Sequence, residues 1–146
     1  MPSNRSIPRG PVIPVLAYPD VDQAAAWLCE AFGFTVRLRI FHHRIQMNLG
    51  EGALVVRELR DPEAGARLGI GHSVMIRVTD ADAHCKGARE HGARITQEPT
   101  TYPFGERQYN AEDFAGRSWT FSQSVADVDP SDWCGIADWG GIAEAL

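Results

Sequence analysis

The feature that most constrains this chain is an internal repeat with an offset of about sixty residues. Segments 13–33 and 73–92 each read as a strand, an acidic turn, an alanine-rich helix and a glycine. Asp20 aligns with Asp80, and Gly33 aligns with Gly92 after a slip of one residue. A repeat of this kind indicates that one supersecondary unit occurs twice. A single unit would leave its sheet face in water, so we expect the two units to share one fold rather than form separate domains.

Both predicted helices carry residues at each end that favour the start or the end of a helix. Asp20 can accept hydrogen bonds from the free N–H groups at the start of the first helix, and Asp80 or Asp82 can do so for the second. Gly33 and Gly92 suit the left-handed residue that ends a helix. These signals predict one helix in each half of the chain.

Strand-like runs follow each helix. Residues 98–105 hold two prolines and a glycine, which predicts a loop, and residues 61–71 are expected to link the halves. The fold class is therefore α+β, with two βαβββ units in one domain at 1–125, unit one at 11–60 and unit two at 72–124. The predicted runs are 34–40, 43–49 and 53–59 in the first half, and 94–97, about 106–111 and 118–124 in the second.

The tail, residues 126–146, reads as a short helix that begins near Asp129 and Pro130. Trp133 and Trp139 are too apolar to leave in water, so we expect the tail to pack on the domain or on a dimer partner.

Charge and composition exclude several classes of protein. The net charge is −5 and there is no basic stripe, which argues against a nucleic-acid partner. No apolar run approaches the roughly 20 residues of a membrane span, and residues 1–10 lack the apolar core of a signal peptide and read as a lead-in arm. The three cysteines are widely spaced and odd in number, which favours free thiols and a cytoplasmic location.

Three stretches resemble a known superfamily. They are VIPVLAYPDVDQAAAWLCEAFGF, GHSVMIRVTDADAHCKGAREHGA and YPFGERQYNAEDFAGRSWTFSQ, the last with a D-x-x-G turn at Asp113–Gly116. In this order they are similar to the vicinal oxygen chelate superfamily, which includes glyoxalase I, bleomycin-resistance proteins and extradiol dioxygenases. The resemblance covers about residues 12–124. It implies two curled mixed sheets around a small-molecule cleft.

The resemblance also implies where a metal would be held, because metal-dependent members place one His, Glu or Gln on each of four strands. Those positions fall here on Ile13, Val56, Ser73 and Thr120, which cannot form a ligand set for a divalent ion. We therefore expect a metal-less branch with no cofactor. A slip of one residue would instead offer His72, with Glu58, as a weak alternative metal site.

Alternation along the strands predicts the side chains that face the cleft. Val74, Ile76 and Val78 are expected to face a helix, so Arg77 should face the cleft, where it could hold a ligand anion or pair with Glu58. The predicted face comprises Ile13, Val15, Ala17, Leu54, Val56, Glu58, Ser73, Met75, Arg77, Ser118, Thr120 and Ser122.

Two further residues are candidates for this site, and the sequence leaves their orientation open. Arg107 and Tyr109 alternate on one predicted strand and share a face, which lines either the cleft or the solvent. The same alternation places Glu106 and Gln108 on the opposite face.

The resulting hypothesis is a homodimer that binds a small, partly apolar organic molecule without a metal, as bleomycin-resistance proteins do. The alternative is a glyoxalase-type, metal-dependent lyase, isomerase or dioxygenase with an atypical ligand set. A third possibility is a non-catalytic dimer whose cleft is vestigial.

Overall fold

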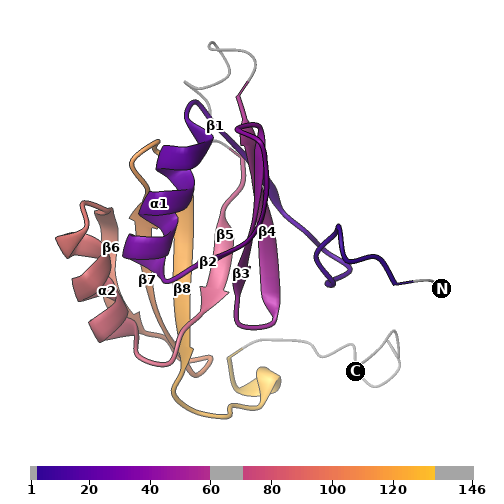
Figure 1. The fold of residues 1–146 in the computed structure, drawn as a ribbon. Coiled ribbons are helices and arrows are strands. Elements are labelled where there is room, and N and C mark those ends of the chain that lie inside the picture. Colours follow the sequence, from indigo (N-terminus) through magenta and orange to yellow (C-terminus); the bar gives the residue numbers. More distant parts are fainter. Residues whose placement is uncertain (1–2, 60–70, 134–146) are drawn as a thin grey trace.

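The computed structural model describes residues 3–59 and 71–133 and contains the same arrangement twice (Figure 1). A short 3-10 helix, η2 (Pro130–Trp133), follows the second unit, where the sequence predicted a tail helix. The prediction of two βαβββ units is confirmed. Unit one consists of β1 (Val15–Tyr18), α1 (Val21–Phe32), β2 (Thr35–Ile40), β3 (Arg44–Leu49) and β4 (Gly52–Glu58), and unit two of β5 (Val74–Arg77), α2 (Ala81–Glu90), β6 (Arg94–Thr101), β7 (Glu106–Glu112) and β8 (Ser118–Ser124).

Both helix starts and the end of α1 match the signals in the sequence, whereas the C-cap of α2 is His91, and Gly92, with φ of 91°, follows it. The Asp20 carboxylate accepts a hydrogen bond from the Gln23 backbone N–H at 3.0 Å, and Asp80 does the same for Ala83 at 3.0 Å. Asp80, and not Asp82, therefore caps the second helix. Gly33 ends α1 in the left-handed conformation, with φ of 82°.

Each unit forms a four-stranded mixed sheet. The strand orders are β1-β4-β3-β2 and β5-β8-β7-β6. β1 runs parallel to β4, and β5 runs parallel to β8, whereas the other neighbours are antiparallel. The two sheets therefore repeat the same topology.

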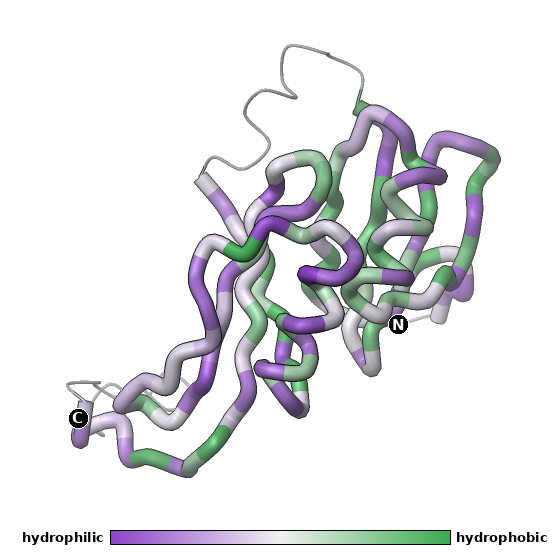
Figure 2. The backbone as a smooth tube through the Cα atoms, turned by 90° about the vertical axis from the view of Figure 1, so that its left-hand side faces the viewer, coloured by the Kyte–Doolittle hydropathy of each residue, from purple (hydrophilic) through white to green (hydrophobic). Residues whose placement is uncertain are grey.

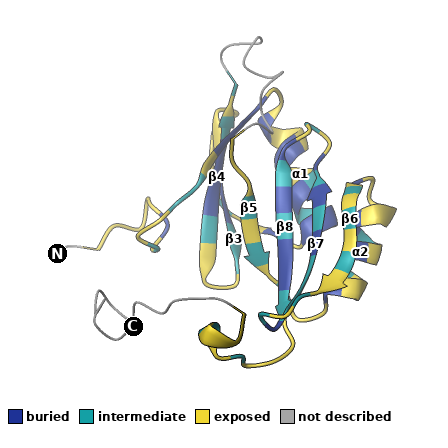
Figure 3. Ribbon diagram, turned by 180° about the vertical axis from the view of Figure 1, so that it is seen from behind, coloured by how far each residue is buried: buried dark blue, intermediate teal, exposed yellow. Residues whose placement is uncertain are grey.

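The helices join the two sheets through one hydrophobic core. The Phe32 ring of α1 lies 5.1 Å from Trp119 and 4.8 Å from Phe121, both on β8. The His84 ring of α2 lies 4.4 Å from the Phe121 ring. Figure 3 shows buried residues on strands of both sheets, and hydrophobic and hydrophilic segments alternate along the chain in Figure 2.

The side of each sheet that faces away from this core is called its open face. On both sheets, the residues of the open face alternate with core residues along each strand. The open face of the first sheet carries Val15, Ala17, Arg44, Gln46, Asn48, Ala53, Val55 and Arg57, and that of the second sheet carries Met75, Arg77, Glu106, Gln108, Asn110, Thr120 and Ser122.

The N-terminal arm contacts the open face of the first sheet. The Gln46 side chain donates to the Ser6 carbonyl at 2.7 Å, and Arg37 donates to the Arg5 carbonyl at 2.8 Å. Figure 1 shows the arm and α1 on opposite sides of the first sheet. The predicted lead-in arm is thus part of the surface that surrounds the open face.

One strand is longer than predicted. β6 continues through Pro99 to Thr101, where the sequence predicted a loop. β6 is an edge strand, and its register with β7 shifts between Gln97 and Thr100. Proline has no N–H for a sheet ladder, so it is tolerated at an edge with such an irregularity.

The D-x-x-G turn connects the two units through a buried carboxylate. One oxygen of Asp113 accepts the Tyr18 hydroxyl at 2.7 Å and the Trp119 indole N–H at 3.0 Å. The other accepts the backbone N–H groups of Ala115 and Arg117, each at 3.0 Å. Burial, with a further contribution from Asp113, raises the pKa of Tyr18, so its hydroxyl remains a donor.

The tail begins by packing on the second unit. The Trp133 ring of η2 lies 5.1 Å from Phe104, which stacks on Tyr102 at 5.3 Å. Trp139 lies outside the described residues, and the position of the rest of the tail stays a prediction. No helix within residues 3–59 and 71–133 is both long and apolar enough to cross a membrane.

Candidate functional site

A pocket of about 460 Å³ lies where the two units meet. It is bounded by the β3–β4 hairpin, the segment before β1, and β5, so neither unit forms it alone. Its wall is mainly apolar, with one charged side chain, as is usual for small-molecule sites. The lining residues are Val12, Pro14, Phe34, Leu49, Gly50, Gly52, Ala53, Leu54, Val74, Met75, Ile76 and Arg77.

The predicted orientation of β5 and β8 is confirmed. Met75 is the register partner of Thr120, and Arg77 is the partner of Ser122. These four side chains share the open face of the second sheet, and Met75 is 64% exposed. Ser73 precedes β5 and is exposed.

The predicted orientation of β1 is also confirmed. Val15 and Ala17 face away from α1, because Leu16 and Tyr18 belong to the core. Val15 is 46% exposed, and Ile13 lies before the strand.

The predicted orientation of β4 is wrong. Leu54 and Val56 were expected in the cleft, but both are in the core, although Leu54 also reaches the wall of the pocket. The pairing of Leu16 with Val56 places Val56 on the same side as the helix-facing residues of β1. The open face of β4 therefore carries Ala53, Val55 and Arg57 instead.

Glu58 also shares the helix-facing register rather than the open one, because it pairs with Tyr18 at the end of β4. Its exposed carboxylate lies 3.4 Å from His43 Nδ1. The alternative of an Arg77–Glu58 ion pair is not what the structure shows, since the Arg77 guanidinium donates to the Ser124 hydroxyl at 2.7 Å.

The proposed cleft positions of Arg107 and Tyr109 are wrong as well. Tyr109 pairs with Phe121 in the core, and its hydroxyl bonds His84 Nδ1. Burial raises the pKa of Tyr109. Arg107 binds the carboxylate of Asp82 in the first turn of α2, with both contacts at 2.9 Å. These residues share a face, as predicted, but it faces α2.

The opposite side of β7 adds Glu106, Gln108 and Asn110, which were not predicted as site residues, to a polar network with Ser122 and Thr120. The Ser122 hydroxyl donates to Glu106 at 2.6 Å, and Gln108 donates to Ser122 at 3.0 Å. The Thr120 hydroxyl donates to Asn110 at 2.8 Å. Bonds from Ser122 and Ser124, with a smaller effect of the Arg77 charge, lower the pKa of Glu106. The alternation already placed Glu106 and Gln108 opposite Tyr109, which is the signal that could have identified them.

The match to known proteins decides the family. The sequence profile of the Glyoxalase/Bleomycin resistance protein/Dioxygenase superfamily matches residues 12–121. The chain belongs to this superfamily. The vicinal oxygen chelate resemblance is therefore confirmed. A search among curated proteins gave no match.

Several solved structures have a similar fold. TioX from Micromonospora sp. ML1 is 31% identical, with a TM-score of 0.65, and the match covers 82% of this chain and 100% of TioX. A bleomycin-binding protein from bleomycin-producing Streptomyces verticillus, complexed with copper(II)-bleomycin, is 21% identical with a TM-score of 0.60, covering 77% and 93%. The fosfomycin resistance protein FosX from Listeria monocytogenes is 11% identical with a TM-score of 0.65, covering 78% and 92%.

The residues at the metal positions of glyoxalase-type relatives do not fit a metal here. Ile13 offers no ligand atom, and Val56 is buried in the core. Val55 and Arg57, which flank Val56 and lie on the open face, do not supply a ligand for a divalent ion either. Ser73 and Thr120 have neutral hydroxyl groups.

The weak alternative ligand, His72, has another role. Its Nε2 lies 2.8 Å from Arg117 Nη1. A guanidinium only donates, so His72 must accept there with its Nε2 lone pair. Arg117 is 3% exposed and also donates to the Ala17 carbonyl at 2.7 Å. A cation at His72 Nε2 would displace this contact and meet the Arg117 charge.

Proposed function

We propose that this superfamily member binds a small, partly apolar organic molecule in the pocket between its two units, and that it does so without a metal. The observation that carries the proposal is the pocket itself, with its apolar wall and its position between the open end of the first sheet and β5. Removal of apolar ligand surface from water favours binding in such a pocket. The bleomycin-binding relative is consistent with binding of an organic molecule by this fold.

Arg77 and the open face of the second sheet supply the polar contacts in this proposal. The Arg77 side chain lines the pocket and is oriented by Ser124. Hydroxyl and amide groups of Thr120, Ser122 and Gln108 lie beside it on the same face. A ligand with an apolar body and hydrogen-bonding groups fits this combination.

We further propose that the protein is a cytoplasmic homodimer. The support is the exposure of apolar side chains beside the pocket, since Val15 and Met75 are both exposed and Val12 is 80% exposed. A second chain that covers these side chains would remove apolar surface from water. The free thiols Cys29 and Cys85 suit a reducing compartment.

A fluorescence titration with N-phenylnaphthylamine, a neutral apolar probe, tests the binding proposal. The wild-type chain is expected to bind the probe in the pocket with micromolar affinity. Ala53 lines the pocket from β4, so Ala53→Phe should fill the space and weaken probe binding at least tenfold. Phenylalanine is well tolerated on a strand surface, so the variant should still fold.

The matched control is Ala83→Phe, which adds the same side chain at an exposed position on α2. It should leave probe affinity unchanged. Equal affinities of wild type and Ala53→Phe would show that the probe binds elsewhere and would reject this pocket as the site.

A further inference from the structure

A second pocket, of about 430 Å³, adjoins the apolar one and has a different chemistry. The two share Gly50 and Ala53 at the end of the β3–β4 hairpin, so one molecule could extend through both. The second pocket lies between the N-terminal arm and the open face of the first sheet. Its lining residues are Arg9, Gly10, Arg37, Asn48, Gly50, Glu51 and Ala53.

Uncharged groups position the guanidinium of Arg37. It donates to the side-chain oxygen of Gln46 and to the Arg5 carbonyl. Gln46 is itself only 3% exposed and is fixed by its bond to the Ser6 carbonyl. Arg37 is thus held in place, but its charge is not neutralised by these partners.

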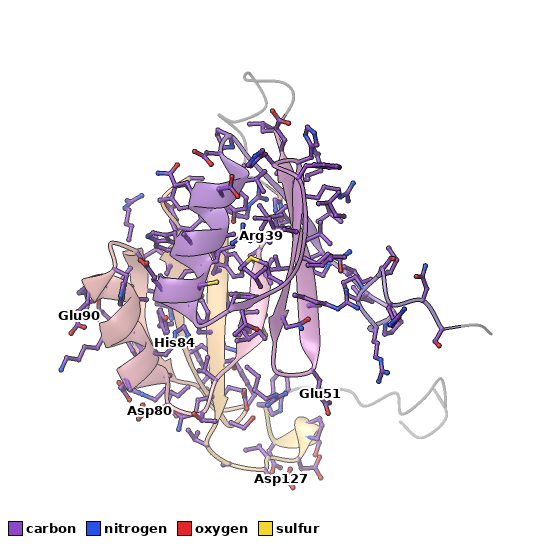
Figure 4. All side chains as sticks on the ribbon, viewed as in Figure 1. Arg39, Glu51, Asp80, His84, Glu90 and Asp127 are labelled. Carbon is purple, nitrogen blue, oxygen red and sulfur yellow. The ribbon has the colours of Figure 1, made fainter. Side chains whose placement is uncertain are left out.

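An arginine on the other side of the same sheet has a charged partner. Arg39 lies two residues further along β2 and pairs with the Asp22 carboxylate of α1 at 3.1 Å; Figure 4 labels it beside α1. Among the residues that the structure describes, neither Arg9 nor Arg37 forms an ion pair. Glu51 lines the same pocket from the exposed hairpin turn, where Figure 4 shows it at the tip.

The positive charge continues along the open face of the first sheet. Arg44 and Arg57 are direct register partners on β3 and β4. Like charges directly opposite each other in a sheet are destabilising. The whole chain has a net charge of −5, so the positive charge on this open face is opposite in sign to the net charge of the protein.

We propose that the natural ligand is an amphipathic anion. Its apolar body occupies the pocket lined by β5, and its oxyanion, a carboxylate, sulfonate or phosphate, binds Arg37, with Arg9 as a second donor. Arginine presents a planar set of donors that matches an oxyanion. The proposal rests on the proposed function, because the apolar pocket must first be a binding site.

Two probes that differ by one charged group test this. Anilinonaphthalene sulfonate has the frame of N-phenylnaphthylamine plus a sulfonate. Arg37→Gln should weaken binding of the sulfonate probe about tenfold, which is the effect of one lost charged hydrogen bond, and should change binding of the neutral probe less than about twofold. Arg37→Lys, which keeps the charge, should retain more of the sulfonate affinity than Arg37→Gln.

Two control variants locate the anion. Arg39→Gln removes an arginine from the opposite side of the same strand and should leave both affinities unchanged. Arg77→Gln removes the other guanidinium that lines the apolar pocket and should have a smaller effect on the sulfonate probe than Arg37→Gln, because Glu106 lies near Arg77. A sulfonate affinity that depends on Arg77 and not on Arg37 would overturn the assignment.

The two proposals fail differently. If the neutral probe binds and is blocked by Ala53→Phe, but Arg37→Gln leaves the sulfonate probe unaffected, only the anion site is wrong. If Ala53→Phe blocks neither probe, the pocket is not the binding site, and both proposals are wrong.

Discussion

The buried carboxylate of Asp113 should be one of the most important single groups for stability. Asp113→Asn keeps the size of the side chain and one carbonyl oxygen, which can still accept the two backbone N–H groups of the turn. The new NH₂ group replaces the oxygen that accepts from Tyr18 and Trp119. The Tyr18 hydroxyl can rotate to accept, but the Trp119 indole can only donate, so two donors then face each other.

The cost can be calculated from these contacts. Hydrogen bonds to a charged group contribute about 1.5–3 kcal/mol each, and two of them change here. We therefore expect the free energy of unfolding to fall by about 3–6 kcal/mol, a large part of the roughly 5–15 kcal/mol available to a domain. In urea, with a slope near 2 kcal/mol/M, the midpoint should fall by about 2 M. Urea unfolding followed by circular dichroism measures both quantities.

Two variants control for other causes. Glu112→Gln removes the neighbouring carboxylate, which forms only a surface pair with Arg94 at 3.0 Å, and should cost less than about 1 kcal/mol. Tyr18→Phe removes one of the two hydrogen bonds, and its loss of unfolding free energy should lie between those of Glu112→Gln and Asp113→Asn. A free energy of unfolding for Asp113→Asn within about 1 kcal/mol of the wild type would refute the argument that this carboxylate holds the two units together.

Three further predictions concern metal content, assembly and pH. Elemental analysis after expression with added zinc, nickel, manganese or iron should find no stoichiometric metal; one tightly bound ion per chain would favour the glyoxalase-type alternative. Light scattering at micromolar concentration should give twice the chain mass of 16.1 kDa, and a value near 16.1 kDa would contradict the proposed dimer. Burial lowers the pKa of His84 in the folded chain, so His84 binds more protons in the unfolded chain. Its contribution to the free energy of unfolding should be fully present above about pH 6.5 and be lost as the pH falls below that value. Urea titrations at about pH 7.5 and pH 5.5 measure this loss, and His84→Phe should reduce it.

The sequence predicted the fold well because local signals and the repeat agreed. Asp20 and Gly33 mark the ends of α1 without reference to the rest of the chain. The alternation of Val74, Ile76 and Arg77 was sufficient to orient β5. The preference for Ser73 over His72 on the cleft side stays a prediction, because both residues lie before β5 and neither lines the pocket.

The orientation of β4 could not be read in the same way. Leu54, Val55 and Val56 are all apolar, so no alternation distinguishes the two faces. Counting four residues past a turn glycine leads to Val56 from Gly52 and to Thr120 from Gly116, but Gly52 lies inside β4 whereas Gly116 lies in the turn before β8. That difference shifts the count by one residue, and a shift of one residue exchanges the faces of a strand.

The candidate anion site was beyond prediction from sequence for a different reason. Arg37 and Arg39 lie two residues apart on β2, so strict alternation would predict that they share a face; the register shift between Val36 and Leu38 separates them. Their partners differ accordingly: Asp22 reaches Arg39 from α1, whereas Arg37 meets Gln46 and the arm. Such contacts depend on where β3, α1 and the arm lie in space.

Comparison of the two units by register explains how a repeat can specify one fold and still present two different open faces. Val56 pairs with Leu16 as Phe121 pairs with Ile76, so Val56 and Phe121 are equivalent, and both are buried in the core. The equivalent residues on the open faces, Arg57 and Ser122, differ completely. Core positions must remain apolar in both units because they fill the same interior, whereas open-face positions contribute nothing to that packing and can diverge. The open face of the first sheet carries arginines, and that of the second sheet carries a network of hydroxyl, amide and carboxylate groups. A ligand between them would therefore meet two different surfaces, which is the condition for binding an asymmetric, amphipathic molecule in one orientation.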